Sequence, residues 1–225
     1  MIYIETADKS ELLRDEREIF RYLGYGNSEP DEYTAEKVKM VSEEVFDAVT
    51  CRACFLVTDI TCTEETVDFG AFSVHAKALA KNLDGCKKAV LLGATVGAQV
   101  DRIIGKYSRI SPASAVIAQA AGAAAIESFC DLVCLRIKDA FRKENLFLRP
   151  RFSPGYGDFS LTYQNELFRY LDCTKKIGLS LTEGLMMTPT KSVTAIIGLG
   201  TNDTNCHKSG CEFCERQSEC DYSRG

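Results

Sequence analysis

The residues best suited to chemistry lie together in the ten-residue stretch from Arg149 to Asp158. This stretch holds two arginines, two prolines and two glycines, with Tyr156 between the glycines. Glycine tolerates positive φ and lets another molecule approach the backbone closely, and proline fixes φ and removes a donor. The pattern predicts a rigid loop that binds an anion or a cofactor through a cationic anchor. A stiff connector between a helix and the next element fits the same pattern equally well.

A second candidate for chemistry is a cluster of cysteines near the end of the chain. Seven of the eleven cysteines are dispersed, but the other four fall within the last twenty residues in the pattern C-x4-C-x2-C-x5-C. Thiolates at these intervals suit tetrahedral zinc or an iron–sulfur cluster, and His207 could replace one ligand. A segment with so few apolar residues needs a metal to order it, although a tail of reduced cysteines without metal remains the alternative. The predicted ligands are Cys206, Cys211, Cys214 and Cys220.

Three other patterns are weaker. Cys51 and Cys54 have the spacing of a redox motif, but they run into a buried-type strand, which favours packing over redox chemistry. His75 has no second metal ligand nearby in the sequence. A strand, a glycine turn and a helix surround Gly93 and Gly97, but the spacing is GxxxG rather than the GxGxxG of a Rossmann nucleotide site.

The composition excludes several classes of function. The chain is 45% hydrophobic and 26% charged, as in ordinary globular proteins, and its net charge of −5 offers no basic surface for nucleic acid. The N-terminus lacks the basic and apolar regions of a secretory signal. Gln119 and Glu127 interrupt the apolar runs 113–118 and 120–126, so no membrane span is expected. We therefore expect a cytoplasmic protein that binds neither nucleic acid nor membrane.

The elements that must position these residues follow from hydrophobic period and helix caps. Ser111 and Pro112 begin a helix that runs to about Lys143, and its alanine-rich first half predicts a central buried helix. Glu127 and Asp131 lie one turn apart on this helix, as either a solvated face or a ligand contact. The other expected helices are 8–23, 34–50, 75–83, 97–107 and 161–171. The expected strands are 53–57, 66–72, 88–94 and a hairpin of 177–187 with 192–199.

These elements do not alternate strictly, so the predicted fold class is α+β. We expect a mixed or antiparallel twisted sheet with a long central buried helix and flanking helices. The predicted organisation is one domain over residues 1–200, followed by the cysteine-rich tail 201–225.

The sequence resembles the activation (reactivation) domain of cobalamin-dependent methionine synthase, most closely over residues 88–200. Arg151-Phe152-Ser153-Pro154-Gly155-Tyr156-Gly157 matches the Arg-x-x-x-Gly-Tyr loop with which that family binds S-adenosylmethionine. The stretch from Leu181 to Pro189, followed by Ser192-Val193-Thr194, is similar to the family's Leu-Thr-Glu…Met-x-Pro…Ser-Val hairpin. Ala124-Ala125-Ile126-Glu127 is similar to the helix whose glutamate contacts the ligand.

The resemblance implies roles for these residues. Arg151 would hold the methionyl carboxylate of S-adenosylmethionine, and Glu127 would pair with its ammonium group or its ribose hydroxyls. Backbone groups of Ser153, Pro154, Gly155 and Gly157 would approach the ligand, and Tyr156 would face the corrin of a partner's cobalamin. The implied activity is reductive remethylation of inactive cob(II)alamin, with an electron from a flavodoxin-like or other donor.

Nothing in the sequence resembles the homocysteine, folate or cobalamin modules of the full-length enzyme, and neither histidine lies in a cobalt-ligand motif. We therefore expect a component that acts in trans on a methionine synthase lacking its own activation domain, or on another corrinoid methyltransferase, rather than an autonomous enzyme. The alternative is a metal-binding regulatory or interaction protein of corrinoid metabolism without reactivation activity. A conventional methyltransferase is disfavoured by the poor Rossmann pattern.

Overall fold

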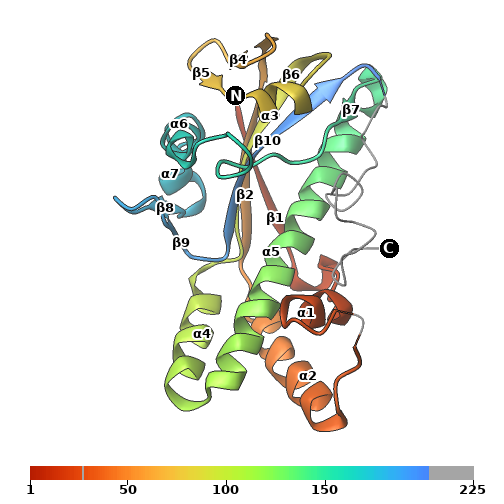
Figure 1. The fold of residues 1–225 in the computed structure, drawn as a ribbon, viewed down its shortest axis with the longest axis vertical. Helices are drawn as coiled ribbons and strands as arrows, with labels where there is room; N and C mark the ends of the chain where they lie inside the picture. The colour runs from red at the N-terminus through yellow and green to blue at the C-terminus, as the bar shows by residue number, and fades with distance from the viewer. Residues whose placement is uncertain (27, 203–225) are drawn as a thin grey trace.

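The computed structural model describes residues 1–26 and 28–202. A five-stranded sheet forms the centre of the molecule, with strand order β1-β2-β6-β10-β7 (Figure 1). Every neighbouring pair in this sheet is antiparallel. The strands are β1 (Ile2–Ala7), β2 (Cys51–Asp59), β6 (Cys86–Thr95), β10 (Ser192–Gly200) and β7 (Phe147–Leu148). The prediction of an α+β fold with a mixed or antiparallel sheet is confirmed, and this sheet is antiparallel.

Helices cover both faces of the sheet, and each face has its own apolar core. On one face the core is built with α1 (Glu16–Tyr22), α2 (Glu32–Asp47), α4 (Ala98–Ile110) and α5 (Pro112–Phe141). On the other face it is built with α3 (Lys77–Asn82), α6 (Gln164–Leu171) and α7 (Cys173–Ile177). In β6, Val90 and Leu92 face the first core, whereas Ala89 and Leu91 face the second. Burial on both faces explains why this strand reads as a continuous apolar run.

Helix α5 is the long buried helix that the sequence predicts. Ser111 accepts a hydrogen bond from the backbone N–H of Ser114 at 3.4 Å, and Pro112 occupies the first turn, so the helix begins where its caps place it. Small residues let neighbours approach closely: a Cβ added at Gly122 would lie 3.0 Å from side-chain atoms of Val100 and Lys191. The helix therefore serves as the support against which the rest of this face packs.

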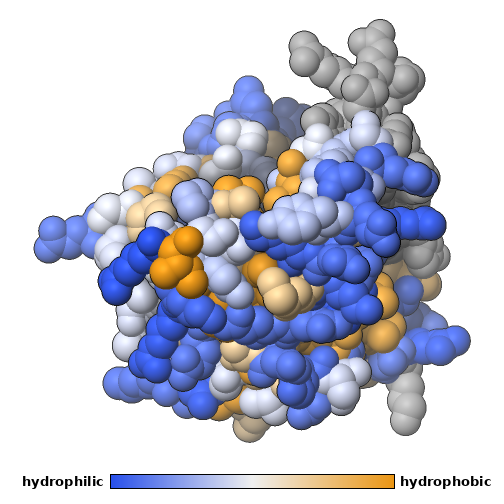
Figure 2. Space-filling view, turned by 90° about the horizontal axis from the view of Figure 1, so that it is seen from below, coloured by the Kyte–Doolittle hydropathy of each residue, from blue (hydrophilic) through white to orange (hydrophobic). Residues whose placement is uncertain are grey.

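By length and composition alone, α5 could cross a membrane, so the expectation that no apolar run approaches a span is too strong. However, 61% of its apolar window is buried inside the protein, as in the core helix of a globular domain. The surface at the end of the molecule seen from below is mostly hydrophilic, with separate apolar side chains between charged ones (Figure 2).

Two N-terminal expectations need correction. Strand β1 was not predicted, although its β-branched and aromatic residues are a strand signal, and it pairs along β2 from Ile2 opposite Leu56 to Ala7 opposite Cys51. The predicted helix 8–23 is shorter. Asp8 caps only the 3-10 turn η1 (Lys9–Glu11), and Asp15 caps α1 by accepting from the N–H groups of Arg17 and Glu18.

The predicted hairpin of 177–187 with 192–199 is wrong. Ile177 ends α7, and the short strands β8 (Ser180–Leu181) and β9 (Met187–Thr188) pair only with each other. β10 pairs instead with β6 in the centre of the main sheet, from Ser192 opposite Thr95 onward. The physical reason is burial: β10 is apolar on both faces and contributes to both cores, so it belongs in a sheet that is covered on both faces rather than in a two-stranded hairpin.

The predicted strand 66–72 forms part of a small three-stranded sheet of β3 (Thr61–Cys62), β4 (Thr66–Asp68) and β5 (Ser73–His75). His75 therefore ends a strand rather than beginning a helix. Short 3-10 turns η2 (Arg142–Glu144) and η3 (Leu161–Tyr163) follow α5 and precede α6.

Candidate functional site

A β-bulge sets the direction of the Arg151 side chain. The N–H of Arg149 donates to the carbonyl of Gly198 at 2.8 Å, and Phe152 exchanges both backbone hydrogen bonds with Ile196, at 2.9 and 2.8 Å. Arg149 and Phe152 are three residues apart, but their partners are only two apart, so Pro150 and Arg151 together oppose Ile197. Bulges re-aim side chains, and Pro150, which has no N–H, is suited to one. Arg151 consequently reaches α5, on the face toward which Ile197 also points.

At α5 the guanidinium of Arg151 meets two carboxylates. Nη2 donates to Oε2 of Glu127 at 2.7 Å, and Nη1 donates to Oδ1 of Asp131 at 2.6 Å. The side chain of Arg151 is 21% exposed, that of Glu127 is 39% exposed and that of Asp131 is 67% exposed. The cation is thus mostly enclosed, whereas one of its two anionic partners lies largely in solvent.

Two thiols complete the surroundings of Arg151. Nη1 also lies 3.6 Å from Sγ of Cys134, and Cys130 is fully buried beside it. Burial lowers the pKa of the Arg151 guanidinium, but Cys130 and Cys134, followed by Asp131 and Glu127, outweigh burial and raise it overall. Burial raises the pKa of both thiols, although Arg151 opposes this rise. The two acidic side chains of the site therefore lie beside one fixed cation and two neutral thiols.

Downstream of Arg151 the loop is held by two tight turns. The N–H of Tyr156 donates to the carbonyl of Ser153 at 3.2 Å, with Pro154 and Gly155 in the corner positions. Gly155 has φ +99°, which a type II turn requires at its third residue. The N–H of Phe159 then donates to the carbonyl of Tyr156 at 3.0 Å. The Tyr156 side chain is 63% exposed, so the turns display it rather than pack it.

The loop is anchored to α3 by Asp158. Its carboxylate accepts from the backbone N–H groups of Lys77 at 2.7 Å and Ala78 at 3.0 Å, and so caps a helix whose own N-cap residue makes no side-chain bond. The bond from Ala78 lowers the pKa of the Asp158 carboxyl. Gly157 lies against the same helix at φ +55°, where an added Cβ would be 2.9 Å from Cβ of Ala78. The predicted rigid loop is therefore both a connector and a fixed support for Tyr156.

The other arginine of the loop has a structural role. Arg149 is buried, donates to the carbonyl of Asp84 at 3.3 Å and contacts Cys86. It packs over Gly198, where an added Cβ would be 2.9 Å from Cγ of Arg149 and 2.7 Å from Sγ of Cys86. Arg149 thus fixes the strand segment from which the bulge begins.

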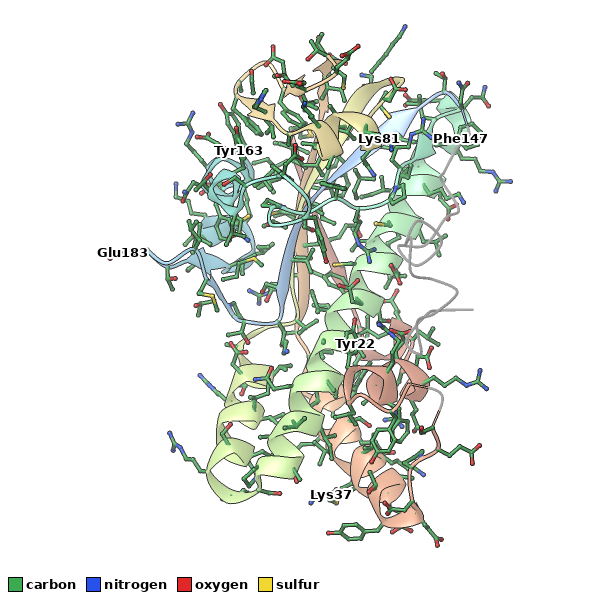
Figure 3. The ribbon with its side chains drawn as sticks, viewed as in Figure 1. Tyr22, Lys37, Lys81, Phe147, Tyr163 and Glu183 are labelled. Carbon is green, nitrogen blue, oxygen red and sulfur yellow. The ribbon has the colours of Figure 1, made fainter. Side chains whose placement is uncertain are left out.

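The structure brings together some of the predicted site residues but not all. Arg151 and Glu127 form one cluster, and residues 153–157 continue directly from it. The hairpin of β8 and β9 packs near α6, on the opposite side of the sheet from α5 (Figure 1), and Glu183 points outward from its tip (Figure 3). Cys206, Cys211, Cys214 and Cys220 lie outside the described residues. Within residues 1–26 and 28–202, no group of three or more His, Cys, Asp or Glu side chains is arranged to hold a metal.

Asp131 and Asp158 contribute to the site but were not among the predicted binding residues. The spacing of Asp131 from Glu127 placed both carboxylates on one helix face, but nothing local connected that face with an arginine twenty residues later. Asp158 had no sequence signal for its role, because it caps a helix some eighty residues earlier in the chain.

The Cys51–Cys54 pair is not a redox motif in this fold. Both residues are buried in β2, but Cys51 belongs to the core beneath α2 and α5, whereas Cys54 belongs to the core on the opposite face. Cys54 lies instead 3.9 Å from Cys173, measured between the Sγ atoms. The preference for packing over redox chemistry at Cys51 and Cys54 agrees with this placement.

A cavity of about 250 Å³ lies elsewhere, at the N-terminal end of α4. Its walls include Thr95, Arg102, Gly178 and Pro189, and none of its lining residues belongs to the loop from Arg149 to Asp158. The Arg151 cluster is therefore a separate feature of the molecule.

Comparison with known proteins connects this loop with a family. The model of the family described as vitamin B12 dependent methionine synthase, activation domain, matches residues 135–222. The match contains the Arg151–Gly157 loop and the β8–β9 hairpin, and it also spans the four clustered cysteines. This chain resembles the activation domain of vitamin B12-dependent methionine synthase. The resemblance inferred from the sequence is confirmed.

The fold agrees with this activation-domain resemblance. A crystal structure of the MetH reactivation domain bound to AdoHcy matches with a TM-score of 0.68, over 93% of this chain and 80% of that chain. Sequence identity is 13%, so this likeness establishes the fold. No curated protein matches the sequence.

Proposed function

We propose that this protein binds S-adenosylmethionine at the Arg151–Glu127 cluster and supports reductive remethylation of cob(II)alamin on a methionine synthase that lacks its own activation domain. The observation that carries the proposal is the ion pair between Glu127, on α5, and Arg151, which lies in the loop that matches the activation-domain family. The similar reactivation domain was crystallised with AdoHcy, which has the same amino-acid group as S-adenosylmethionine. The protein is proposed to be cytoplasmic.

The charges of the cluster suit the zwitterionic end of the ligand. A carboxylate is bound best by the planar fork of an arginine, and an ammonium group by a carboxylate. Arg151 and Glu127 present these two groups 2.7 Å apart, so the ligand's carboxylate and ammonium can each meet an opposite charge. Gly155 leaves room for the ligand to approach the loop backbone, because it has no side chain at this exposed turn.

Tyr156 is the proposed contact with the corrin of the partner's cobalamin. Its exposed ring is displayed by two turns and held by the Asp158 anchor, as a platform for a flat macrocycle requires. In the proposed reaction, one electron from a flavodoxin-like or other donor and the methyl group of S-adenosylmethionine restore the methylated cobalamin, and S-adenosylhomocysteine is released. The chain's own residues bind and orient the ligands and supply neither a nucleophile nor a general base.

For the tail we propose a metal site made of Cys206, Cys211, Cys214 and Cys220, with zinc or an iron–sulfur cluster. Zinc would give a structural clip, whereas an iron–sulfur cluster would give a relay for the electron. Iron, zinc and acid-labile sulfide measured on anaerobically purified protein distinguish the two. Metal-free protein with four titratable tail thiols would overturn both.

The functional test is remethylation in trans. A cobalamin-loaded methionine synthase without an activation domain is poised as cob(II)alamin, mixed with S-adenosylmethionine and reductant, and followed by its visible spectrum. We expect wild-type protein to convert cob(II)alamin to methylcobalamin and the Arg151→Ala variant to fail. If wild-type protein binds S-adenosylmethionine but neither associates with the partner nor speeds remethylation, a regulatory protein of corrinoid metabolism becomes the better account.

A further inference from the structure

Arg151 is paired with two carboxylates, although the proposed ligand has only one ammonium group for a carboxylate to meet. Glu127 alone would suffice to meet the ligand's ammonium group, yet Asp131 takes Nη1 of Arg151 at 2.6 Å. The two carboxylates therefore divide the Nη1–Nη2 edge of the guanidinium between them, one oxygen each. A ligand carboxylate that binds this edge in a fork requires both nitrogens, and so must take Nη1 from Asp131.

We propose that Asp131 is an internal competitor that sets the affinity of the site for ligands carrying a carboxylate. The proposal rests on the proposed function of the Arg151 cluster. Asp131 occupies Nη1 as a carboxylate mimic, and the ligand's own carboxylate displaces it toward solvent. Asp131 thereby lowers the affinity for every ligand that binds through its carboxylate, and it leaves ligands without this group unaffected.

The exposed fractions identify which acid gives way. Asp131 is 67% exposed and Glu127 is 39% exposed, so Asp131 recovers hydration most readily when it leaves the arginine. Glu127 also gives up Nη2 to the ligand's carboxylate, but it turns to the ligand's ammonium group rather than to solvent. Cys134, the other neighbour of Nη1, is a neutral thiol and does not compete in charge.

The size of the effect follows from the exposure of the pair. Ion pairs as exposed as this one change an equilibrium by a factor of roughly 1.5 to 5. Removing the charge of Asp131 should therefore tighten binding of S-adenosylmethionine by about two- to fivefold. A positioning role for Asp131 predicts the opposite sign, because an unsupported guanidinium would bind the ligand more weakly.

The experiment compares ligands that do and do not carry the amino-acid group. S-adenosylmethionine, S-adenosylhomocysteine and methylthioadenosine are titrated into wild type, Asp131→Asn and Asp139→Asn by calorimetry. Asp139 is an exposed acid two turns further along α5, so its variant makes the same change in net charge away from Arg151. Asp131→Ala serves as a second variant, and a thermal melt checks that each protein is folded.

We expect Asp131→Asn to bind both amino-acid ligands about two- to fivefold more tightly, with methylthioadenosine unchanged and Asp139→Asn like wild type. Unchanged or weaker binding of S-adenosylmethionine in both Asp131 variants would overturn the competitor role. Equal tightening in Asp139→Asn, or of methylthioadenosine, would also overturn it. If wild type binds none of the amino-acid ligands, the proposed function itself fails, which is a distinguishable result.

Discussion

Two arginines of this protein each hold two carboxylates, and the difference between them separates a structural clamp from the proposed binding site. Arg136, on α5, donates to Glu5 at 2.9 Å, to Glu11 at 2.6 Å and to the backbone carbonyl of Thr6 at 2.8 Å. Its acceptors come from β1 and the following turn, so the cluster ties the N-terminal strand to the central helix. All three of these hydrogen bonds of Arg136 therefore connect one part of the folded chain to another.

The acceptors of Arg151 come instead from α5 alone, and the arginine itself stands on a bulge beside the exposed Tyr156. Giving up Asp131 would free one guanidinium nitrogen and detach no strand or helix from the core. Giving up Glu5 or Glu11 would loosen β1. The same set of charges can therefore stabilise a fold or bind a ligand, depending on whether its acceptors can be released.

The largest expected effect on stability comes from β10, where it pairs with the segment that carries Arg151. Gly198→Ala would place a Cβ 2.7 to 2.9 Å from buried atoms of Cys86, Leu83 and Arg149. We expect the free energy of unfolding to fall by about 1–3 kcal/mol in urea titrations, because overpacking strains a filled core.

Gly105→Ala is the matched control for that variant, since it lies in α4 with no atom within 4 Å of the added Cβ. An alanine in a helix interior should leave stability equal or slightly higher. Equal stability of the two variants would show that Arg149 and Cys86 do not pack against Gly198 as described.

A smaller loss of stability is expected when the Arg136 clamp is removed. Arg136→Ala deletes three hydrogen bonds and leaves Glu5 and Glu11 without their cation, so the free energy of unfolding should fall by on the order of 1 kcal/mol. Arg17→Ala, at an exposed position of α1, is the control and should stay near wild type. Hydrogen exchange should increase first in β1. No increase there would contradict the role of Arg136 as a clamp.

The smallest expected effect on stability concerns Asp158, whose carboxylate anchors the loop to α3, and this effect depends on pH. The pKa of Asp158 is lowered from its ordinary 3.8 by the hydrogen bond from Ala78. A carboxyl group whose pKa is lowered by folding stabilises the fold at pH values above its ordinary pKa. This contribution is lost as the pH falls through the lowered pKa. Asp158→Asn should therefore be less stable than wild type at pH 7, and the difference in urea midpoint should shrink near pH 3. An equal difference at both pH values would rule out the carboxylate as its source.

The long helix could be predicted from the sequence because its signals are local. The cap residues Ser111 and Pro112 indicate where α5 begins. The run of small residues that follows indicates that other elements pack closely around the helix. The α+β class with a mixed or antiparallel sheet also followed from the order of elements. These features need no knowledge of which strands are neighbours.

The direction of Arg151 could not be predicted in the same way. It depends on one extra residue opposite Ile197, and so on the pairing of the segment 149–152 with β10, which is set by tertiary contacts. The hairpin prediction failed for the same reason: β10 pairs with β6, about a hundred residues earlier in the chain. The family resemblance identified Arg151 and Glu127 without this geometry, but it did not include Asp131.

Calorimetric titration of S-adenosylmethionine into wild type, Arg151→Ala and Arg136→Ala tests the central claim most directly. Each variant removes one arginine from a pair of carboxylates, but only Arg151 lies in the proposed site. We expect Arg151→Ala to weaken binding by roughly 100-fold or more, since it loses charge-assisted bonds to the ligand, and Arg136→Ala to bind like wild type. Equal affinity of Arg151→Ala and wild type, or an equal loss in both variants, would contradict the assignment of the ligand site to Arg151.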